Sequence, residues 1–255
     1  MNSSVSKNYD LIASIFDHDM ALNMRYDDIG FYVDRINGKV SVLEVGCGTG
    51  RISIPVSRVC DHLVGIDISL PMLFELKRKL ESAAEKTSNI QLIAMNACSI
   101  ALQKKFDYIF FGFSSINYLT QPAQVANFLL SLKPLLKDGG CVLLDAFVPK
   151  VANGSTDAWM EDYIRVIPGG GKLKRLKSIT AEGEISFVRR RYERYSVDGN
   201  LEQVINTESR IRPYSPEDLC RFLQEAGFEL QGTWWNYEVR AREGADFFSV
   251  EARLE

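Results

Sequence analysis

The chain is poor in the residues from which disulfide frameworks and metal sites are built. Its five cysteines are scattered without a Cys-x-x-Cys pair, and only two histidines are present, His18 and His62. Isolated cysteines predict reduced thiols and argue against a disulfide frame or a zinc site. We therefore expect a cytoplasmic protein whose chemistry needs no metal.

Long apolar runs and an excess of charge of one sign are also missing. No apolar stretch approaches the ~20 residues that span a bilayer, and the first ten residues lack the apolar core of a signal peptide. A net charge of −3 gives no general attraction to nucleic acid or to anionic membranes. With 255 residues and 46% hydrophobic content, the composition is that of an ordinary globular domain, or of one with a sizeable insertion.

Short apolar runs alternate with helical patterns in the first part of the chain. The runs predict buried strands at 40–45, 63–67, 90–96, 108–113 and 141–147. One helix is predicted to start at Ser69 and Pro71, and a second to run from Pro122 to Lys137 and stop at Gly139-Gly140. This alternation predicts a doubly wound, mostly parallel sheet, which binds ligands beyond the carboxyl ends of its strands.

The later part of the chain has a different pattern. Four strands with few helical signals are predicted at 163–167, 172–180, 184–197 and 201–212. Asp198-Gly199 predicts a hairpin turn. A helix from Ser215 or Pro216 to Ala226, ended by Gly227, should precede two final strands at 228–239 and 247–254.

These patterns predict three units. An N-terminal helical cap spans 1–36, and an α/β domain with a seven-stranded sheet spans 37–157 and 213–255. An antiparallel sheet at 158–212, inserted into that domain, should serve substrate binding or oligomerisation.

The most specific feature is a glycine-rich turn after the first strand. Glu44 stands two residues before Gly46, Gly48 and Gly50, and the next strand ends in Asp67. Glycines let the backbone approach a ligand closely. A dinucleotide site would use G-x-G-x-x-G around a pyrophosphate, which a neighbouring carboxylate repels. The acid and the spacing instead suit S-adenosylmethionine, which carries an ammonium and a sulfonium; a tight turn without a ligand is the alternative.

Residues 40–147 resemble the cofactor-binding core of class I S-adenosylmethionine-dependent methyltransferases, through the motif VLEVGCGTG and through Asp67 in GIDIS. The resemblance implies a Rossmann-like fold, with the Asp67 carboxylate on both ribose hydroxyls. It also implies apolar packing of Ile68 and Met72 on adenine.

The same resemblance assigns residues further along the chain. Asn96 and Ala97 should lie beside adenine, although the family usually has Asp where this chain has Asn96. The Asn96 amide oxygen can still accept from the adenine amino group, and a polar residue at a strand end is the alternative. Phe113, Ser114 and Ser115 should line the methionine part of the cofactor.

The N-terminal segment resembles the helical caps of sugar-amine and glycine-type N-methyltransferases. This implies that Tyr9 faces the sulfonium or the cofactor carboxylate, with which Arg25 could pair. His18 is the candidate base because of its titration range, and Tyr118 could point into the acceptor site. For each of these four residues, a surface or packing role is the alternative.

The run Arg189-Arg190-Arg191 is the main basic feature. Strand alternation divides these arginines between two faces of the sheet, where nearby glutamates can pair with them. An ion-paired sheet face is favoured over a nucleic-acid surface, and a phosphate-bearing acceptor would be the exception.

We therefore expect a methyltransferase acting on an amine or a hydroxyl of a small molecule, without nucleic-acid or membrane partners and with a homodimer left open. An RNA-modifying methyltransferase and a non-catalytic S-adenosylmethionine-binding protein are the alternatives from other classes.

Overall fold

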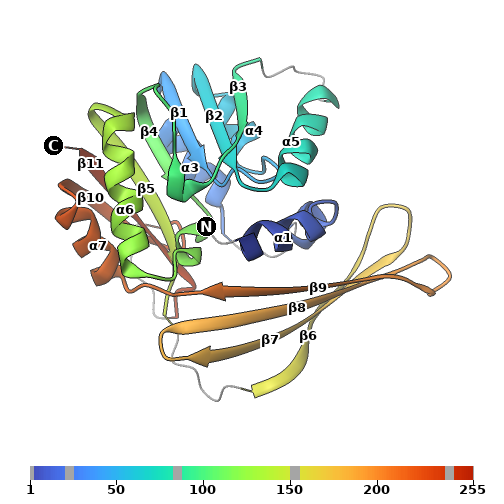
Figure 1. The fold of residues 1–255 in the computed structure, drawn as a ribbon. Coiled ribbons are helices and arrows are strands. Elements are labelled where there is room, and N and C mark those ends of the chain that lie inside the picture. Colours follow the sequence, from blue (N-terminus) through green and yellow to red (C-terminus); the bar gives the residue numbers. More distant parts are fainter. Residues whose placement is uncertain (1–2, 21–25, 83–87, 150–155, 239–243, 255) are drawn as a thin grey trace.

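The structure, a computed structural model, describes residues 3–20, 26–82, 88–149, 156–238 and 244–254 (Figure 1). Its main sheet has seven strands in the order β10-β11-β5-β4-β1-β2-β3. Their bounds are β1 Ser41–Val45, β2 His62–Asp67, β3 Ile90–Ala94, β4 Phe106–Phe111, β5 Leu136–Phe147, β10 Phe228–Trp235 and β11 Phe247–Leu254. The first five strands pair in parallel, and β11 runs antiparallel to both of its neighbours. The predicted fold class is confirmed.

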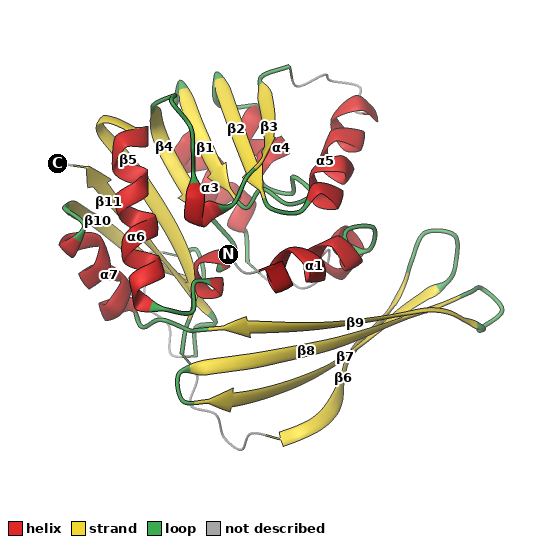
Figure 2. Ribbon diagram, in the orientation of Figure 1, coloured by secondary structure: helices red, strands yellow, loops and turns green. Residues whose placement is uncertain are grey.

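Helices cover both faces of this sheet because its central strands are apolar on both sides (Figure 2). Leu43 and Val45 of β1 face α6 (Pro122–Leu132) and α7 (Pro216–Glu225). Val42 of the same strand faces α3 (Asp28–Ile36) and α4 (Ser53–Ser57). The fifth helix, α5 (Leu70–Ser82), packs through Leu73 and Leu76. Thus α3, which lies within the predicted cap, packs on the sheet.

The helix predicted from Pro122 to Lys137 is shorter than expected. It ends at Leu132, is followed by a 3₁₀ turn at Lys133–Leu135, and β5 begins at Leu136. Pro134 cannot donate a helical hydrogen bond, which explains the early end. The predicted role of Gly139-Gly140 as the helix stop is wrong, since both glycines lie within β5, where its register with β4 shifts.

The inserted sheet is a four-stranded antiparallel meander in the order β6-β7-β8-β9. Its strands are β6 Thr156–Val166, β7 Lys172–Glu182, β8 Ile185–Tyr195 and β9 Leu201–Ile211. The predicted hairpin turn at Asp198-Gly199 joins β8 to β9, with a left-handed φ of 83° at Gly199. β6 starts at Thr156, seven positions earlier than the predicted strand.

The N-terminal helix α1 (Ser3–Ile12) lies between the main sheet and the inserted sheet (Figure 1), and a second short helix, α2 (Phe16–Met20), follows it. Ile12, Ala13 and Ile15 form a buried cluster with Met72 of α5 and with three residues of the inserted sheet, which are Leu173, Tyr192 and Ile205. The segment therefore contacts both layers. Within the described ranges, no helix has both the length and the apolar character needed to cross a membrane.

Candidate active site

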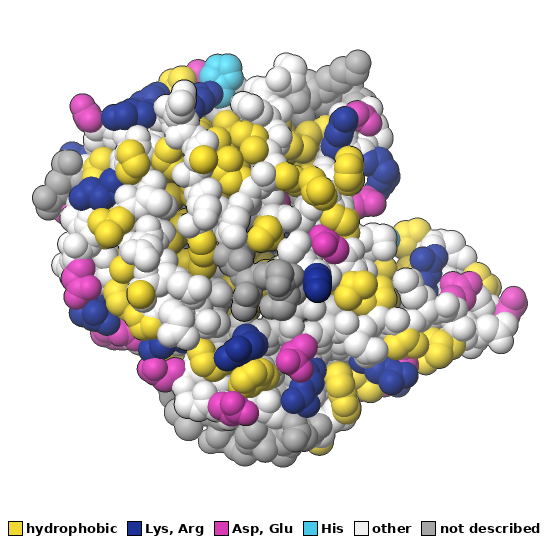
Figure 3. Space-filling model, viewed as in Figure 1, with side chains coloured by type: hydrophobic (Ala, Val, Ile, Leu, Met, Phe, Trp, Pro, Cys, Tyr) yellow, Lys and Arg dark blue, Asp and Glu magenta, His cyan; other side chains and the backbone are white. Residues whose placement is uncertain are grey.

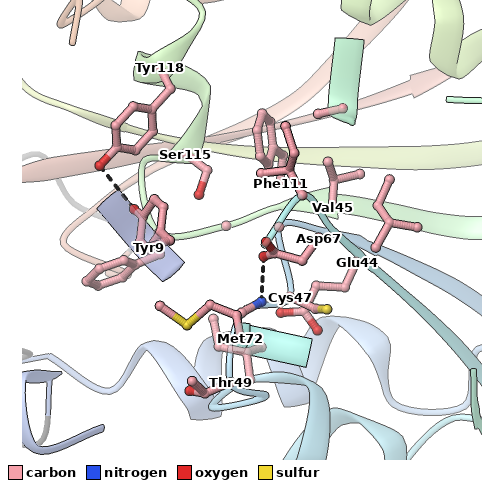
Figure 4. A pocket seen from close by; sticks show the side chains of 18 of the residues that line it. Tyr9, Glu44, Val45, Cys47, Thr49, Asp67, Met72, Phe111, Ser115 and Tyr118 are labelled. Carbon is pink, nitrogen blue, oxygen red and sulfur yellow. Dashed lines mark hydrogen bonds between the residues drawn. The ribbon is translucent and has the colours of Figure 1, made fainter. Parts of the chain in front are cut away.

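A pocket that is partly open to solvent lies at the carboxyl ends of β1, β2 and β4 (Figure 4). Its lining includes many of the predicted site residues, namely Tyr9, Glu44, Gly46, Gly48, Asp67, Ile68, Met72, Ala97, Phe113, Ser115 and Tyr118. Figure 4 shows Tyr9 and Tyr118 on one side of the pocket and the acidic side chains of Glu44 and Asp67 on the other. The sheet topology thus brings together residues far apart in the sequence.

The three glycines of the turn have different surroundings. All have left-handed φ angles, 74° at Gly46, 54° at Gly48 and 82° at Gly50. A Cβ added at Gly48 would meet no atom within 4 Å, whereas one at Gly50 would lie 2.1 Å from Leu76 Cδ1. Gly48 therefore leaves space for a ligand, while Gly50, which does not line the pocket, allows α5 to pack on the turn.

Asp67 connects the end of β2 to the glycine turn. Its Oδ2 accepts from the Gly48 amide at 2.8 Å and its Oδ1 accepts from the Ser69 amide at 2.8 Å. Burial raises the pKa of Asp67, and these amide donors oppose that shift because they favour the carboxylate. The carboxylate is thus held in one orientation at the pocket wall.

Glu44, on β1, is a buried acid beside the same turn. It is 3% exposed and accepts a hydrogen bond from Ser53 Oγ at 2.5 Å. Burial raises the pKa of Glu44 to about 8, against the opposing effects of Ser53 and Arg51. A carboxyl group buried in this way gains from a cationic ligand, which would favour its charged form.

Tyr9 and Tyr118 form a pair at the opposite side of the pocket. Tyr9 Oη donates to Tyr118 Oη at 3.0 Å, and the rings meet edge to face with centroids 5.9 Å apart. Burial, and then Tyr118, raises the pKa of Tyr9 well above its ordinary value. The Tyr9 phenol therefore stays protonated and offers hydrogen bonds rather than acting as a base.

Two aspartates fasten the N-terminal segment to the pocket rim. Asp10 Oδ1 accepts from Ser69 Oγ at 2.6 Å. Asp17 accepts from Thr49 Oγ1 at 2.7 Å and pairs with Lys79 of α5 at 2.5 Å. These contacts hold α1 and α2 over the glycine turn.

A third aspartate fastens the same segment to the inserted sheet. Asp19 is buried and accepts hydrogen bonds from Tyr192 at 3.1 Å and from Tyr163 and Arg175. Arg175 also donates to Asp162 of β6 at 2.7 Å. The pairing of Asp19 with Arg175 is thus part of a hydrogen-bonded network that links α2 to β6, β7 and β8.

Four predicted site residues do not line the pocket. His18 is exposed, because α2 turns its neighbours Asp19 and Met20 inward. The Asn96 side chain accepts from the Cys98 amide at 2.9 Å and caps the turn Ala97–Ser99. Ser114 is buried in a left-handed conformation, and its Oγ has no hydrogen-bond partner within the described part of the chain. The fourth, Gly50, packs on α5 as described above, and Arg25 lies outside the described residues.

Arg51 is a pocket residue that the sequence analysis missed. Its guanidinium forms a two-pronged hydrogen bond with Asp28 of α3, at 2.9 and 2.5 Å, and its Cζ lies 5.1 Å from the centre of the Phe113 ring. The available signal was its position immediately after the last glycine of the turn. Within the described residues, no cluster of three or more His, Cys, Asp or Glu side chains could hold a metal ion.

The pocket fits a nucleoside-type ligand that carries positive charge. Its walls combine two acidic side chains, the buried Glu44 and the half-buried Asp67, with a backbone turn left open at Gly48. Ile68 and Met72 add an apolar surface for a flat ring. This combination favours S-adenosylmethionine over a dinucleotide, because a cationic ligand stabilises both acids as carboxylates whereas a pyrophosphate would be repelled by Asp67 and would oppose ionisation of Glu44.

Comparisons with known proteins agree with this site. The model of a family described as a methyltransferase domain matches residues 42–140. N-methyltransferase FrzE of Cladobotryum sp. is 29% identical over 164 residues, covering 58% of this chain and 54% of that protein, so the chain spans about half the length of this relative.

Two solved structures have the same fold over nearly the whole chain. An S-adenosylmethionine-dependent methyltransferase from Clostridium acetobutylicum matches with a TM-score of 0.78 and 18% identity, covering 96% of this chain and 98% of that one. The sugar N-methyltransferase KedS8 from Streptoalloteichus sp. matches with a TM-score of 0.75 and 18% identity, covering 95% and 92%.

The fold defines an α/β protein of the Rossmann-like type. More specifically, residues 42–140 match a methyltransferase domain, and the predicted family, enzyme class and cofactor agree with that match and with the fold.

Proposed function

We propose that this protein transfers a methyl group from S-adenosylmethionine to an amine of a small molecule. The observation that carries the proposal is the enclosure of the pocket, which α1 and α2 cover through Val5, Tyr9 and Phe16, with the inserted sheet packed behind them. Such a half-buried site suits a small acceptor better than an open groove does. The amine target is supported by the N-methyltransferases to which the chain is similar.

Each wall of the pocket has a proposed role in holding the cofactor. Glu44 would face its ammonium, and Asp67 would accept hydrogen bonds from both ribose hydroxyls. Ile68, Met72 and Ala97 would pack on adenine. Arg51, a cationic side chain in the pocket lining, would pair with the carboxylate of the cofactor. Bound S-adenosylmethionine supplies a methyl group on a positively charged sulfur, an excellent leaving group.

The chain's own contribution to the reaction is then mainly alignment and exclusion of water. The Tyr9–Tyr118 pair would hold the acceptor amine by hydrogen bonds, with Tyr9 remaining a neutral phenol. Since His18 is exposed and outside the pocket, we propose that the amine enters unprotonated and needs no base from the protein. The fraction of the acceptor amine that is unprotonated, and therefore able to react, would then increase as pH rises.

Calorimetry with S-adenosylmethionine, and with NADH for comparison, tests the cofactor site. Replacing Asp67 by Asn should weaken S-adenosylmethionine binding by on the order of a hundredfold, because a charged acceptor for two hydroxyls is lost. Asp138→Asn, at an exposed position in β5, is the matched control and should bind normally. Normal S-adenosylmethionine binding by the Asp67 variant would contradict the proposed contact between Asp67 and the ribose. Absence of S-adenosylmethionine binding by the wild-type protein would contradict the proposed function.

The acceptor itself is identified by mass spectrometry. A panel of small amines and alcohols incubated with the protein and S-adenosylmethionine should give amine products heavier by one methyl group. Methylation confined to alcohols would contradict the amine assignment.

An RNA-modifying role is less well supported. Two arginines of the basic run pair with glutamates, in the pairs Arg189–Glu208 and Arg191–Glu193, and the nearby Arg194 pairs with Glu202. On the face shown in Figure 3, Lys and Arg side chains are interspersed with Asp and Glu rather than gathered in a stripe. RNA binding needs a continuous basic surface.

A further inference from the structure

One arginine of the basic run differs from its neighbours. Arg190 is half-buried on β8, between Val188 and Tyr192, which are both buried and lie on the same face of the strand. Tyr192 on that face donates to Asp19 of α2. Arg190 therefore lies on the inner face of the inserted sheet, which the N-terminal segment covers.

Arg190 has no ionic partner of its own. Arg189 pairs with Glu208 at 3.1 Å and Arg191 with Glu193 at 2.7 Å. Across the described residues, Arg190 makes no ion pair and no side-chain hydrogen bond. The predicted ion-paired sheet face thus accounts for its neighbours and leaves Arg190 unexplained.

The positive charges around Arg190 make its lack of an ionic partner energetically more costly. Lys177 of β7 stands directly opposite Arg190 in the sheet, and like charges in that relation destabilise a sheet. Lys177 is held by Asp162 at 2.7 Å, which also binds Arg175. The two acids in these ion pairs, Asp162 and Asp19, are thus both engaged by Arg175.

Arg190 does not line the pocket itself, but it lies near α1, the helix that carries the pocket residue Tyr9. Arg190 pairs in register with Thr207 of β9, and α1 contacts the next residue of β9 through Asn8, whose Nδ2 donates to the Glu208 carbonyl at 2.5 Å. Tyr9 of the same helix lines the pocket. The Arg190 charge lowers the pKa of both Tyr9 and Tyr192, against the larger effect of burial, as expected of a guanidinium near both phenols.

We infer that Arg190 binds an anionic group of the methyl acceptor, a carboxylate or a phosphate, while the amine lies at Tyr9 and Tyr118. The acceptor is then a small amine that carries negative charge. A guanidinium suits this role because its planar fork donates two parallel hydrogen bonds to either anion. The inference rests on the proposed function, because it concerns the acceptor of the same reaction.

The test uses the full chain loaded with S-adenosylhomocysteine, the demethylated cofactor, with inorganic phosphate and acetate as separate probes. Arg190→Gln is compared with Arg189→Gln, a matched control at the adjacent position. Phosphate, acetate or both should raise the midpoint of thermal unfolding of wild type and Arg189→Gln. In Arg190→Gln the apparent affinity for the same anion should fall at least tenfold, and Arg190→Lys should restore part of it.

The outcomes separate the two proposals. The anion that stabilises wild type more strongly identifies a phosphate or a carboxylate as the recognised group. Equal responses in wild type and Arg190→Gln, or no response of wild type to either anion, would overturn the Arg190 site. Normal S-adenosylhomocysteine binding by Arg190→Gln shows that the variant is folded. Failure of wild type to bind S-adenosylhomocysteine would instead overturn the proposed function.

Discussion

At the scale of single residues, Glu44 is the group whose charge should change when the cofactor binds. Its pKa of about 8 keeps the carboxyl protonated near neutral pH, whereas a cationic ligand favours the carboxylate. Binding should therefore release a proton. Between pH 6 and pH 7, where the ligand's own ammonium stays charged, affinity should rise by up to about tenfold per pH unit. Calorimetry in two buffers of different ionisation enthalpy measures the released proton directly.

The variant Glu44→Gln provides the control and a second measurement. In unfolded chains the carboxyl ionises at its ordinary, lower pKa, so between that value and pH 8 the folded wild type binds the extra proton. Wild-type stability should then fall as pH rises through this window, and Glu44→Gln should lack this loss. A variant that still releases a proton on binding would show that another group titrates.

Two glycines of the turn make separable predictions. Both have left-handed φ angles, so alanine at either position carries strain. Gly50→Ala should also clash with Leu76, lowering the free energy of unfolding by about 1–3 kcal/mol more than Gly48→Ala does. Gly48→Ala should instead reduce S-adenosylmethionine affinity on the order of tenfold, because its Cβ occupies ligand space. Denaturant unfolding and calorimetry measure the two effects, and a reversal would contradict the division of roles.

Among the predicted residues that line the pocket, some have positions that the backbone fixes. Gly48 and Asp67 follow apolar strands that can only be buried, so their place at the strand ends follows from the sheet topology. Asn96, by contrast, follows the partly exposed edge strand β3 and uses its side chain to cap a local turn. The side chain of Arg51 is held at the pocket by a hydrogen bond to Asp28 of α3. No local sequence pattern predicts that α3 packs at this position.

At the scale of elements, α2 is a short helix that is held by its side chains. Five residues cannot form a stable helix alone, and Asp19 anchors it to Arg175, Tyr163 and Tyr192. Asp19→Ala should cost about 3–5 kcal/mol, since it leaves Arg175 buried beside a single acid. Hydrogen exchange should increase in residues 3–20 and in β7 and β8.

The matched control for Asp19 is an exposed ion pair of the same sheet. Lys174 pairs with Glu161 between β7 and β6 at 3.0 Å, and Lys174→Ala should leave the unfolding midpoint and the hydrogen exchange of α2 unchanged, because exposed pairs contribute little. If both variants behaved alike, the Asp19 network would not anchor α2.

The sequence predicts the elements that depend on local patterns, but it does not predict those that depend on contacts between distant residues. The strands and α7 follow from apolar periodicity and from the Ser215 cap, which accepts from the Asp218 amide at 3.1 Å. The end of α6 was misplaced because the glycine pair outweighed Pro134, a stronger helix breaker. The position of α2 depends on contacts more than a hundred residues apart in sequence, such as Asp19 with Tyr163 and Arg175.

At the scale of the whole molecule, the N-terminal segment joins the two sheets across the pocket. Asp17 fastens it to Thr49 and Lys79 on the cofactor side, and Asp19 fastens it to the inserted sheet. Since Tyr9 and Phe16 of this segment line the pocket, we expect it to move aside when the cofactor enters and to return afterwards.

Removing the contacts of Asp17 with Thr49 and Lys79 should therefore change the rates of S-adenosylmethionine binding and release more than its affinity. The contacts of Asp17 exist before the cofactor binds, and if they also hold afterwards they cancel in Kd and contribute only to the barrier. Asp17→Ala should raise the association and dissociation rates for S-adenosylmethionine on the order of tenfold each, with Kd within about threefold. Stopped-flow binding measures both rates. Lys77→Ala, on the exposed side of α5, should leave them unchanged, and an unchanged association rate in Asp17→Ala would show that the segment does not gate entry.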